Sequence, residues 1–121
     1  MKPPLSDELR VRHVLDAIKE IESYLHYASE ESFLSNSEKR FATIKQIEII
    51  GEACARITPD IKERYPDVDW KNIVGFRNIS IHEYFGVNFR IVWQIAQINL
   101  PVLKQQFSNI LEEFAKAKPG T

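Results

Sequence analysis

The stretch FRIVWQIAQINLPVLKQQFSNILEEF, Phe89–Phe114, carries the strongest structural signal in the chain. Its apolar residues recur mostly at steps of three or four, the spacing that places side chains along one side of an α-helix. Pro101 interrupts the stretch, has no amide hydrogen and crowds the carbonyl of Gln97, so we expect a kink and not a break. The stripe consists of Phe89, Val92, Trp93, Ala96, Leu100, Leu103, Phe107, Ile110, Leu111 and Phe114.

The same period predicts three further helices upstream of this one. The first should be capped by Ser6 or Asp7 and run to about Ser29, and the third should be capped by Asp67 or Asp69. The second should end at Thr58, and residues 59–66 should form a short helical turn between two prolines. No segment alternates as a strand does. The sequence therefore predicts an all-α fold, an up-and-down antiparallel bundle of four main helices plus a short connecting helix, as one domain over residues 1–121.

Two local patterns refine this picture. A polar break, EESFLSNSEKR at residues 30–40, separates the first two helices, and its Ser35 and Glu38 have the spacing of a capping box. In the second helix Gly51, with Ala53 and Ala55 beside it, should allow a neighbouring segment to approach closely. The single cysteine between these residues should be a buried packing residue.

Composition limits the function classes. The chain has 121 residues with 44% hydrophobic content and a net charge of −1, so any contact with RNA or DNA must be local. No apolar run approaches the roughly 20 residues of a membrane span, and the N-terminus lacks the apolar core of an export signal. With a single cysteine there is also no sign of an oxidising compartment. We expect a cytoplasmic protein with no membrane contact.

Polar residues crowd into the stretch RNISIHEY, Arg77–Tyr84, in the expected third helix. On a regular helical wheel that starts at Trp70, Arg77 falls inside the apolar stripe, while Phe76 and Ile79 fall on the outer face. A buried guanidinium requires a carboxylate, a carbonyl or a bound anion. Arg77 could therefore pair with an internal acid, Glu48 or Glu52, or it could serve an anionic substrate.

His82 lies five residues after Arg77, about 140° around the axis of a regular helix. Side chains so placed splay apart, so they serve one substrate only if the helix end bends or if a second copy of the helix supplies the complementary pair across a two-fold axis. This spacing favours a homodimer. The alternative for His82 alone is an exposed histidine near the helix C-terminus, where the helix dipole favours its charge.

The stretch RNISIHEY resembles the R-x4-H-x-Y signature of the HepT-like branch of the HEPN superfamily, small helical ribonuclease toxins of prokaryotic toxin–antitoxin pairs. The resemblance extends over DWKNIVGFRNISIHEYFGVNFRIVWQIAQINLPVL, residues 69–103, and over IKQIEIIGEA, residues 44–53. It implies that Arg77 and His82 form the catalytic centre and that Asn78 supports them. It also implies that Tyr84 is the residue to which a partner nucleotidyltransferase antitoxin adds AMP.

These implied roles fit RNA cleavage that needs no metal and no other cofactor. His82 titrates near neutrality and could transfer a proton, while Arg77 could stabilise charge on the phosphate oxygens. His13 and His26 lack the acidic or thiolate neighbours of a metal cluster, and we interpret both as non-catalytic. Tyr84 on its own could equally be an aromatic at the rim of the core.

Two other function classes remain open at this stage. The chain could be a catalytically inactive HEPN protein that acts as a dimerising or nucleotide-associated binding module. It could also be a structural helical adaptor in which the motif makes only buried polar contacts. An arginine in an open cleft would favour the ribonuclease, and an arginine held by internal acids would favour the adaptor.

Overall fold

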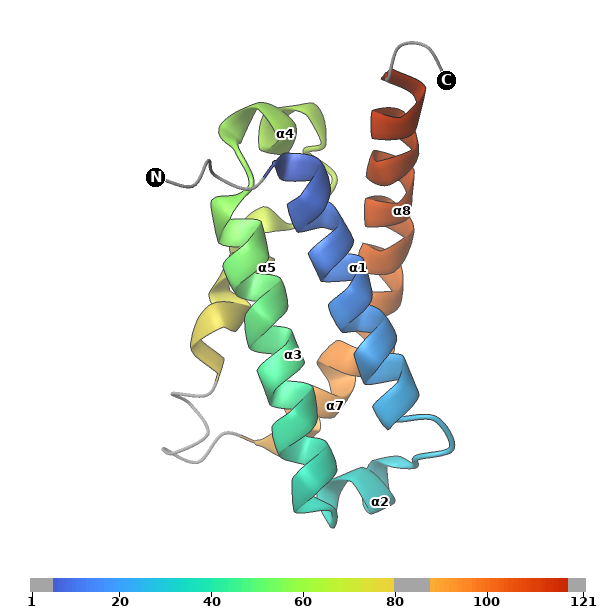
Figure 1. Cartoon of the computed structure of the whole chain (residues 1–121). Helices are drawn as coiled ribbons and strands as arrows, with labels where there is room; N and C mark the ends of the chain where they lie inside the picture. The colour runs from blue at the N-terminus through green and yellow to red at the C-terminus, as the bar shows by residue number, and fades with distance from the viewer. Residues whose placement is uncertain (1–5, 80–87, 118–121) are drawn as a thin grey trace, which may run out of the picture.

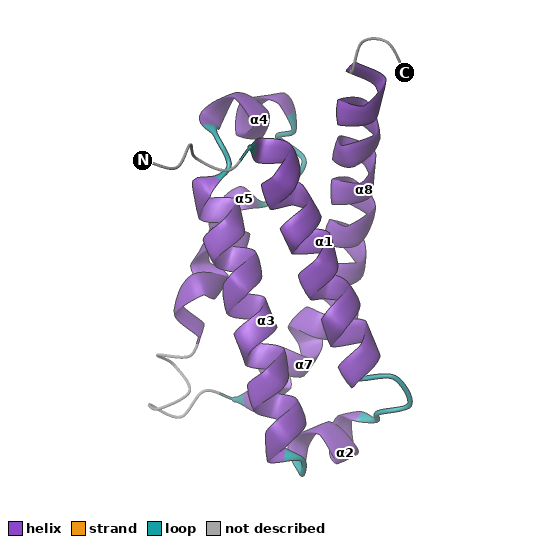
Figure 2. Cartoon of the chain, viewed as in Figure 1, coloured by secondary structure: helices purple, strands orange, loops and turns teal. Residues whose placement is uncertain are grey.

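The computed structural model describes residues 6–79 and 88–117 of the chain (Figure 1). Helices and short turns make up these residues, and no strand occurs among them (Figure 2). The predicted all-α bundle is confirmed. The elements are α1 (Asp7–Tyr24), α2 (Glu30–Leu34), α3 (Ser37–Arg56), α4 (Pro59–Arg64), α5 (Trp70–Gly75), a 3₁₀ turn (Phe76–Asn78), α7 (Phe89–Gln94), a π-helical segment (Ile95–Asn99) and α8 (Leu100–Ala117).

The core is built around α1, which lies between α3 and α8. Helix α1 packs mainly against α3 and also against α8, and Figure 1 shows the three long helices side by side. Most of the apolar side chains that recur at three and four residues face inward, because this spacing returns to the same side of a helix. Leu9 and Phe41, near the starts of α1 and α3, are exceptions and are exposed. Fully buried members include Val14, Ile18, Ile47, Ile50, Cys54, Phe107 and Ile110. No helix among the described residues is long and apolar enough to cross a membrane.

The connection between α1 and α3 differs from the prediction. Helix α1 ends at Tyr24, five residues earlier than expected, and the polar break contains the additional helix α2. A capping box does occur there, but it joins Ser29 and Ser32, whose hydroxyls accept from each other's amides at 3.1 and 2.9 Å. Ser35 and Glu38 do not form it, since Asn36 caps α3 by accepting from the Lys39 amide at 3.0 Å.

The proline in the last helix is accommodated by a change of winding. Between α7 and α8 the residues Ile95–Asn99 are π-helical, and the Leu100 amide donates to the Ile95 carbonyl five residues earlier. Such a wider turn makes room where the ring of Pro101 would otherwise meet the carbonyl of Gln97. The chain stays helical through Pro101, as predicted, and in Figure 1 α7 runs obliquely to α8.

The segment that carries the polar motif is anchored at its start. The Asp69 carboxylate accepts from the Asn72 amide at 3.4 Å and so caps α5, which decides between the two predicted caps. The Trp70 indole nitrogen donates to the Tyr65 carbonyl at 2.9 Å, and its ring lies 5.6 Å from that of Phe107 on α8. These contacts fix the beginning of α5 against the bundle.

Beyond α5 the winding tightens, and the regular-helix wheel is wrong here. Ile73, Phe76 and Ile79 are all buried, at a spacing of three residues. This spacing fits the 3₁₀ turn at Phe76–Asn78, which has about three residues per turn, so that every third side chain faces the same way. Phe76 and Ile79 therefore point into the core and not outward as the wheel placed them.

The backbone of this 3₁₀ turn lies directly on Gly51 of α3. A Cβ atom at position 51 would lie 2.8 Å from the Phe76 carbonyl carbon and 3.0 Å from the Arg77 Cα, and closer still to the Arg77 amide nitrogen. No side chain fits in that space, which confirms the close approach expected at Gly51. The backbone of Arg77 thus packs directly against α3 at Gly51, where no side chain separates the two segments.

We predict opposite effects for alanine at two glycines. Gly51→Ala should lower the free energy of unfolding by about 1–3 kcal/mol, because the new methyl group must displace the backbone at Phe76 and Arg77. Gly75 is helical with φ −61°, and a Cβ there would meet nothing within 4 Å. Gly75→Ala should therefore raise stability by about 0.5–1 kcal/mol. Urea unfolding of both variants checks this, and equal effects would contradict it.

Candidate functional site

Arg77 lies on the 3₁₀ turn at the surface of the bundle. Its side chain is exposed, contrary to the wheel drawn from Trp70, because the buried face of this segment runs through Ile73, Phe76 and Ile79. The predicted alternative of an internal pair with Glu48 or Glu52 is also wrong for the described part of the chain. Glu52 lies 3.8 Å from Arg56 on its own helix, and no described acid forms an ion pair with Arg77.

The other motif residues differ in what the structure describes. Asn78 follows Arg77 on the 3₁₀ turn and is likewise exposed, so both polar side chains reach solvent from a backbone seated on α3. His82 and Tyr84 lie outside the described residues. The structure therefore describes the arginine half of the predicted centre.

Two hollows adjoin the turn that carries Arg77. One, of about 490 Å³, is lined by Asp69, Lys71, Asn72, Gly75, Phe76 and Ile79. The second, of about 190 Å³, lies between α5 and α8 and shares Asp69, Asn72 and Phe76 with the first. On the side opposite α5, Ile98 of the π-helical segment and Val102 of α8 are 65% and 58% exposed. The face beside Arg77 thus combines recessed polar groups with apolar side chains in solvent.

The cysteine and the two histidines outside the motif show no sign of a catalytic or metal-binding role. Burial raises the pKa of Cys54 to about 12, against a lowering contribution from Lys62, so the thiol stays protonated and unreactive at neutral pH. His13 and His26 are exposed on and just after α1. Within residues 6–79 and 88–117, no group of three or more histidine, cysteine, aspartate or glutamate side chains is arranged to hold a metal ion.

One arginine that the sequence analysis did not single out has a clear structural role. Arg40 donates from Nη1 to the Leu34 carbonyl at 2.6 Å, and its guanidinium lies 4.6 Å from the centre of the Phe89 ring. It thereby joins the end of α2, the start of α3 and the first residue of α7. Only the tertiary fold brings Phe89 to Arg40, so no sequence spacing signals this contact.

Comparisons with known proteins agree on one family. The profile of the family described as "Ribonuclease HepT-like" matches residues 14–110. A Thermococcus cleftensis protein named "Probable ribonuclease HepT" is 35% identical over 97 residues, which cover 80% of this chain and 88% of that protein. A Methanocaldococcus jannaschii protein provisionally named an RNase is 33% identical over 83% of each chain. Another, from Caldanaerobacter subterraneus, is 34% identical over 85% of this chain and 92% of its own length. No solved structure matches the chain.

The exposure of Arg77 predicts that its side chain adds little to stability. Arg77→Ala should change the free energy of unfolding by less than about 0.5 kcal/mol, as surface substitutions without specific contacts do. Arg40→Ala is the matched control, and it should destabilise by about 2 kcal/mol because it removes a charged hydrogen bond and a cation–π contact. Chemical denaturation of both variants measures this. A large loss of stability in Arg77→Ala would show that the guanidinium is a structural group.

Proposed function

The chain belongs to the HepT-like ribonuclease family, and we propose from this premise that it is an endoribonuclease toxin whose catalytic groups are Arg77 and His82. The observation that carries the proposal is the state of Arg77. Its backbone is seated against Gly51, while its side chain is exposed and paired with no described acid. A guanidinium held in this way is available to an anionic ligand such as an RNA phosphate.

In the proposed reaction the ribose 2′-hydroxyl attacks the adjacent phosphorus. The new O2′–P bond forms as the P–O5′ bond breaks, which leaves a 2′,3′-cyclic phosphate on one fragment and a 5′-hydroxyl on the other. His82 takes the proton of the 2′-hydroxyl and delivers it to the departing O5′, and Arg77 stabilises the negative charge that grows on the phosphate oxygens. Asn78, exposed beside Arg77, supports the two by hydrogen bonding to the same phosphate group.

We further propose that the active form is a homodimer with the catalytic groups at its cleft. The exposed apolar residues Ile98 and Val102 support this. They border the hollow between α5 and α8, and a second copy of the chain would cover them. The turn that carries Arg77 follows directly on α5. A dimer formed through this face would therefore bring the two arginines toward a common cleft.

The competing function is a catalytically inactive HEPN module that only dimerises or accompanies a nucleotide-binding partner. An exposed arginine that no described acid neutralises favours the nuclease over this module and over a structural adaptor. The whole chain would act as one helical domain, in the cytoplasm, where its RNA substrate is found. Its partner would be a nucleotidyltransferase antitoxin.

We predict cleavage of single-stranded RNA in the presence of EDTA. Arg77→Ala and His82→Ala should each lower the rate by about a hundredfold or more, since each removes a group that acts in the transition state. Arg64→Ala, an exposed arginine of α4, is the control and should cleave at the wild-type rate. The proposed mechanism is wrong if EDTA abolishes cleavage and His82→Ala does not.

Mixing the two inactive variants tests the cleft. If Arg77 of one copy acts with His82 of the other, a hybrid dimer of Arg77→Ala and His82→Ala contains one intact site and one doubly altered site. Cleavage should therefore reappear after the variants are unfolded and refolded together. Each variant refolded alone should stay inactive. Failure of the mixture, with hybrid dimers verified by mass spectrometry, would place both groups within one copy.

Regulation gives a further prediction, at Tyr84. AMP on this tyrosine would add a phosphate close to Arg77 and so compete with the RNA phosphate. Tyr84→Phe should cleave RNA as before and should resist silencing by the nucleotidyltransferase and ATP, because it lacks the acceptor oxygen. Peptide mass spectrometry should map the AMP to the peptide that contains Tyr84. AMP on another residue, or full silencing of Tyr84→Phe, would contradict this assignment.

A further inference from the structure

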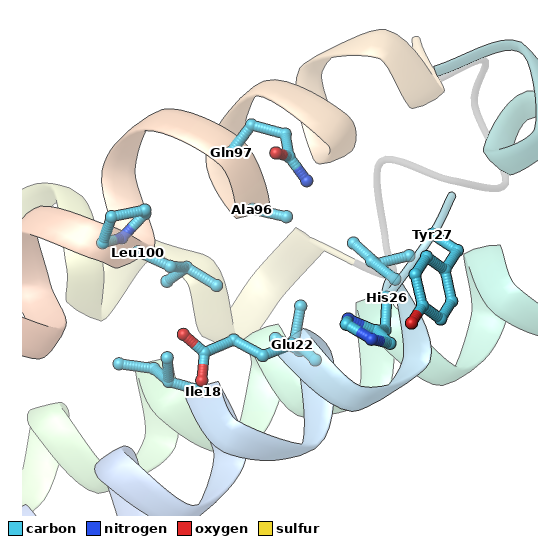
Figure 3. Close-up of a pocket in the computed structure, with 10 residues that line it drawn as sticks. Ile18, Glu22, His26, Tyr27, Ala96, Gln97 and Leu100 are labelled. Carbon is cyan, nitrogen blue, oxygen red and sulfur yellow. The ribbon is translucent and has the colours of Figure 1, made fainter. Parts of the chain in front are cut away.

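A separate recess lies apart from the motif and from the two hollows beside Arg77, between the end of α1 and the π-helical segment (Figure 3). Its volume is about 290 Å³, near the lower end of the range of about 300–1,000 Å³ that is typical of small-molecule sites. Buried aliphatic side chains, among them Ile18, Ile21 and Leu100, form its floor. The recess can therefore hold one flat ring system on an apolar base.

Tyr27 stands at one end of this recess, in the turn that follows α1, where the Ala28 amide donates to the Leu25 carbonyl at 2.9 Å. Its φ is 67°, in the left-handed region where glycine is favoured and a bulky side chain is strained. The residue is 95% exposed, so core packing does not hold the ring there. Its ring lies 3.9 Å from that of His26, at an angle of 49°. Two aromatic rings are thus presented together at the mouth of an apolar recess.

Hydrogen-bonding groups complete the lining. Figure 3 shows the Glu22 carboxylate toward the other end of the recess from the two rings, and Gln97 on the facing helical segment. Lys104 donates to both oxygens of Glu22, at 3.1 and 2.9 Å, and so neutralises the carboxylate. Each oxygen retains a further lone pair with which it can accept from a ligand. The Gln97 amide can both donate and accept.

We propose that this recess binds a guanine ring, either as an unpaired RNA base or as part of a free nucleotide. Aromatic rings stack with bases, and the Watson–Crick edge of guanine carries two adjacent donors, N1–H and the N2 amino group, which match the two oxygens of one carboxylate. Adenine, cytosine and uracil lack that pair of donors. Gln97 donates to the guanine O6. The bicyclic ring spans from the aromatic end of the recess to Glu22.

The direct test is a titration of ¹⁵N-labelled protein with guanosine, inosine and adenosine 5′-monophosphates, followed by NMR. Inosine monophosphate differs from guanosine monophosphate only by the missing N2 amino group, so it should bind about fivefold to tenfold more weakly. Guanosine monophosphate should shift the amide signals of His26, Tyr27 and Gln97. Equal affinities for the three nucleotides, no binding at millimolar concentration, or shifts confined to Arg77 and Asn78 would overturn the proposal.

Variants at Tyr27 separate binding from folding. Tyr27→Gly removes the ring and relieves the left-handed backbone, so it should weaken binding about tenfold while the melting temperature stays unchanged or rises. Tyr27→Phe keeps a stacking ring and should bind almost as tightly as the wild type. Glu22→Gln should abolish the preference for guanosine over inosine monophosphate. Unchanged affinity in both Tyr27→Gly and Glu22→Gln would contradict the proposed mode of binding.

An oligonucleotide distinguishes the two sources of guanine. If the natural ligand is an RNA base, the proposal rests on the ribonuclease function. If it is a free nucleotide, the proposal is independent of that function. A short 2′-O-methyl RNA with one guanine cannot be cleaved by 2′-hydroxyl attack, and it should shift the same signals if the natural ligand is an RNA base. If only the monophosphate binds, the site serves a free nucleotide. Arg77→Ala should bind guanosine monophosphate as tightly as the wild type, because Arg77 does not line the recess. Loss of RNA cleavage and loss of guanine binding can therefore be observed independently.

Discussion

The missing side chain at Gly51 is the constraint on which the rest of the motif region depends. Backbone atoms of Phe76 and Arg77 occupy the space that any Cβ there would need. This contact seats the 3₁₀ turn on α3 and lets Phe76 and Ile79 reach the core, while Arg77 remains in solvent. Packing and chemistry are thus divided between neighbouring residues: the apolar ones hold the turn, and the arginine between them stays available to an anion.

Periodicity predicts the fold well where helices are long and regular. In α1, α3 and α8 the apolar stripes are the buried surfaces, because many residues share one winding and errors in single positions average out. It fails where elements are short. Helix α2 has five residues and is held by Ser29 and Ser32, too short for a period to be recognised. Around Phe76–Asn78 the wheel drawn from Trp70 misplaces both Arg77 and Phe76, since the buried face runs through Ile73, Phe76 and Ile79, whereas Trp70 itself is only half-buried.

The candidate site shows the same division between sequence and tertiary structure. The motif of Arg77, Asn78, His82 and Tyr84 can be recognised in the sequence because its residues are close along the chain. The recess lined by Tyr27, Glu22 and Gln97 cannot, because its parts come from α1, the turn after it and a segment some 70 residues later. Both sites would bring RNA to one bundle: a phosphate at Arg77, and a base stacked on Tyr27. Residues of α1 and α8 line the recess, and α1 also packs against α3, on which the turn with Arg77 is seated.

Cleavage by folded Gly51→Ala tests the central claim most directly, since the claim is that the bare surface of α3 positions Arg77 for catalysis. The rate should be measured on single-stranded RNA at a temperature where circular dichroism shows Gly51→Ala and Gly75→Ala to be fully folded. The account predicts that Gly51→Ala loses about a hundredfold in rate, because displacement of the Arg77 backbone misplaces its guanidinium, while Gly75→Ala cleaves normally. A fully folded Gly51→Ala that cleaves RNA at the wild-type rate would contradict it.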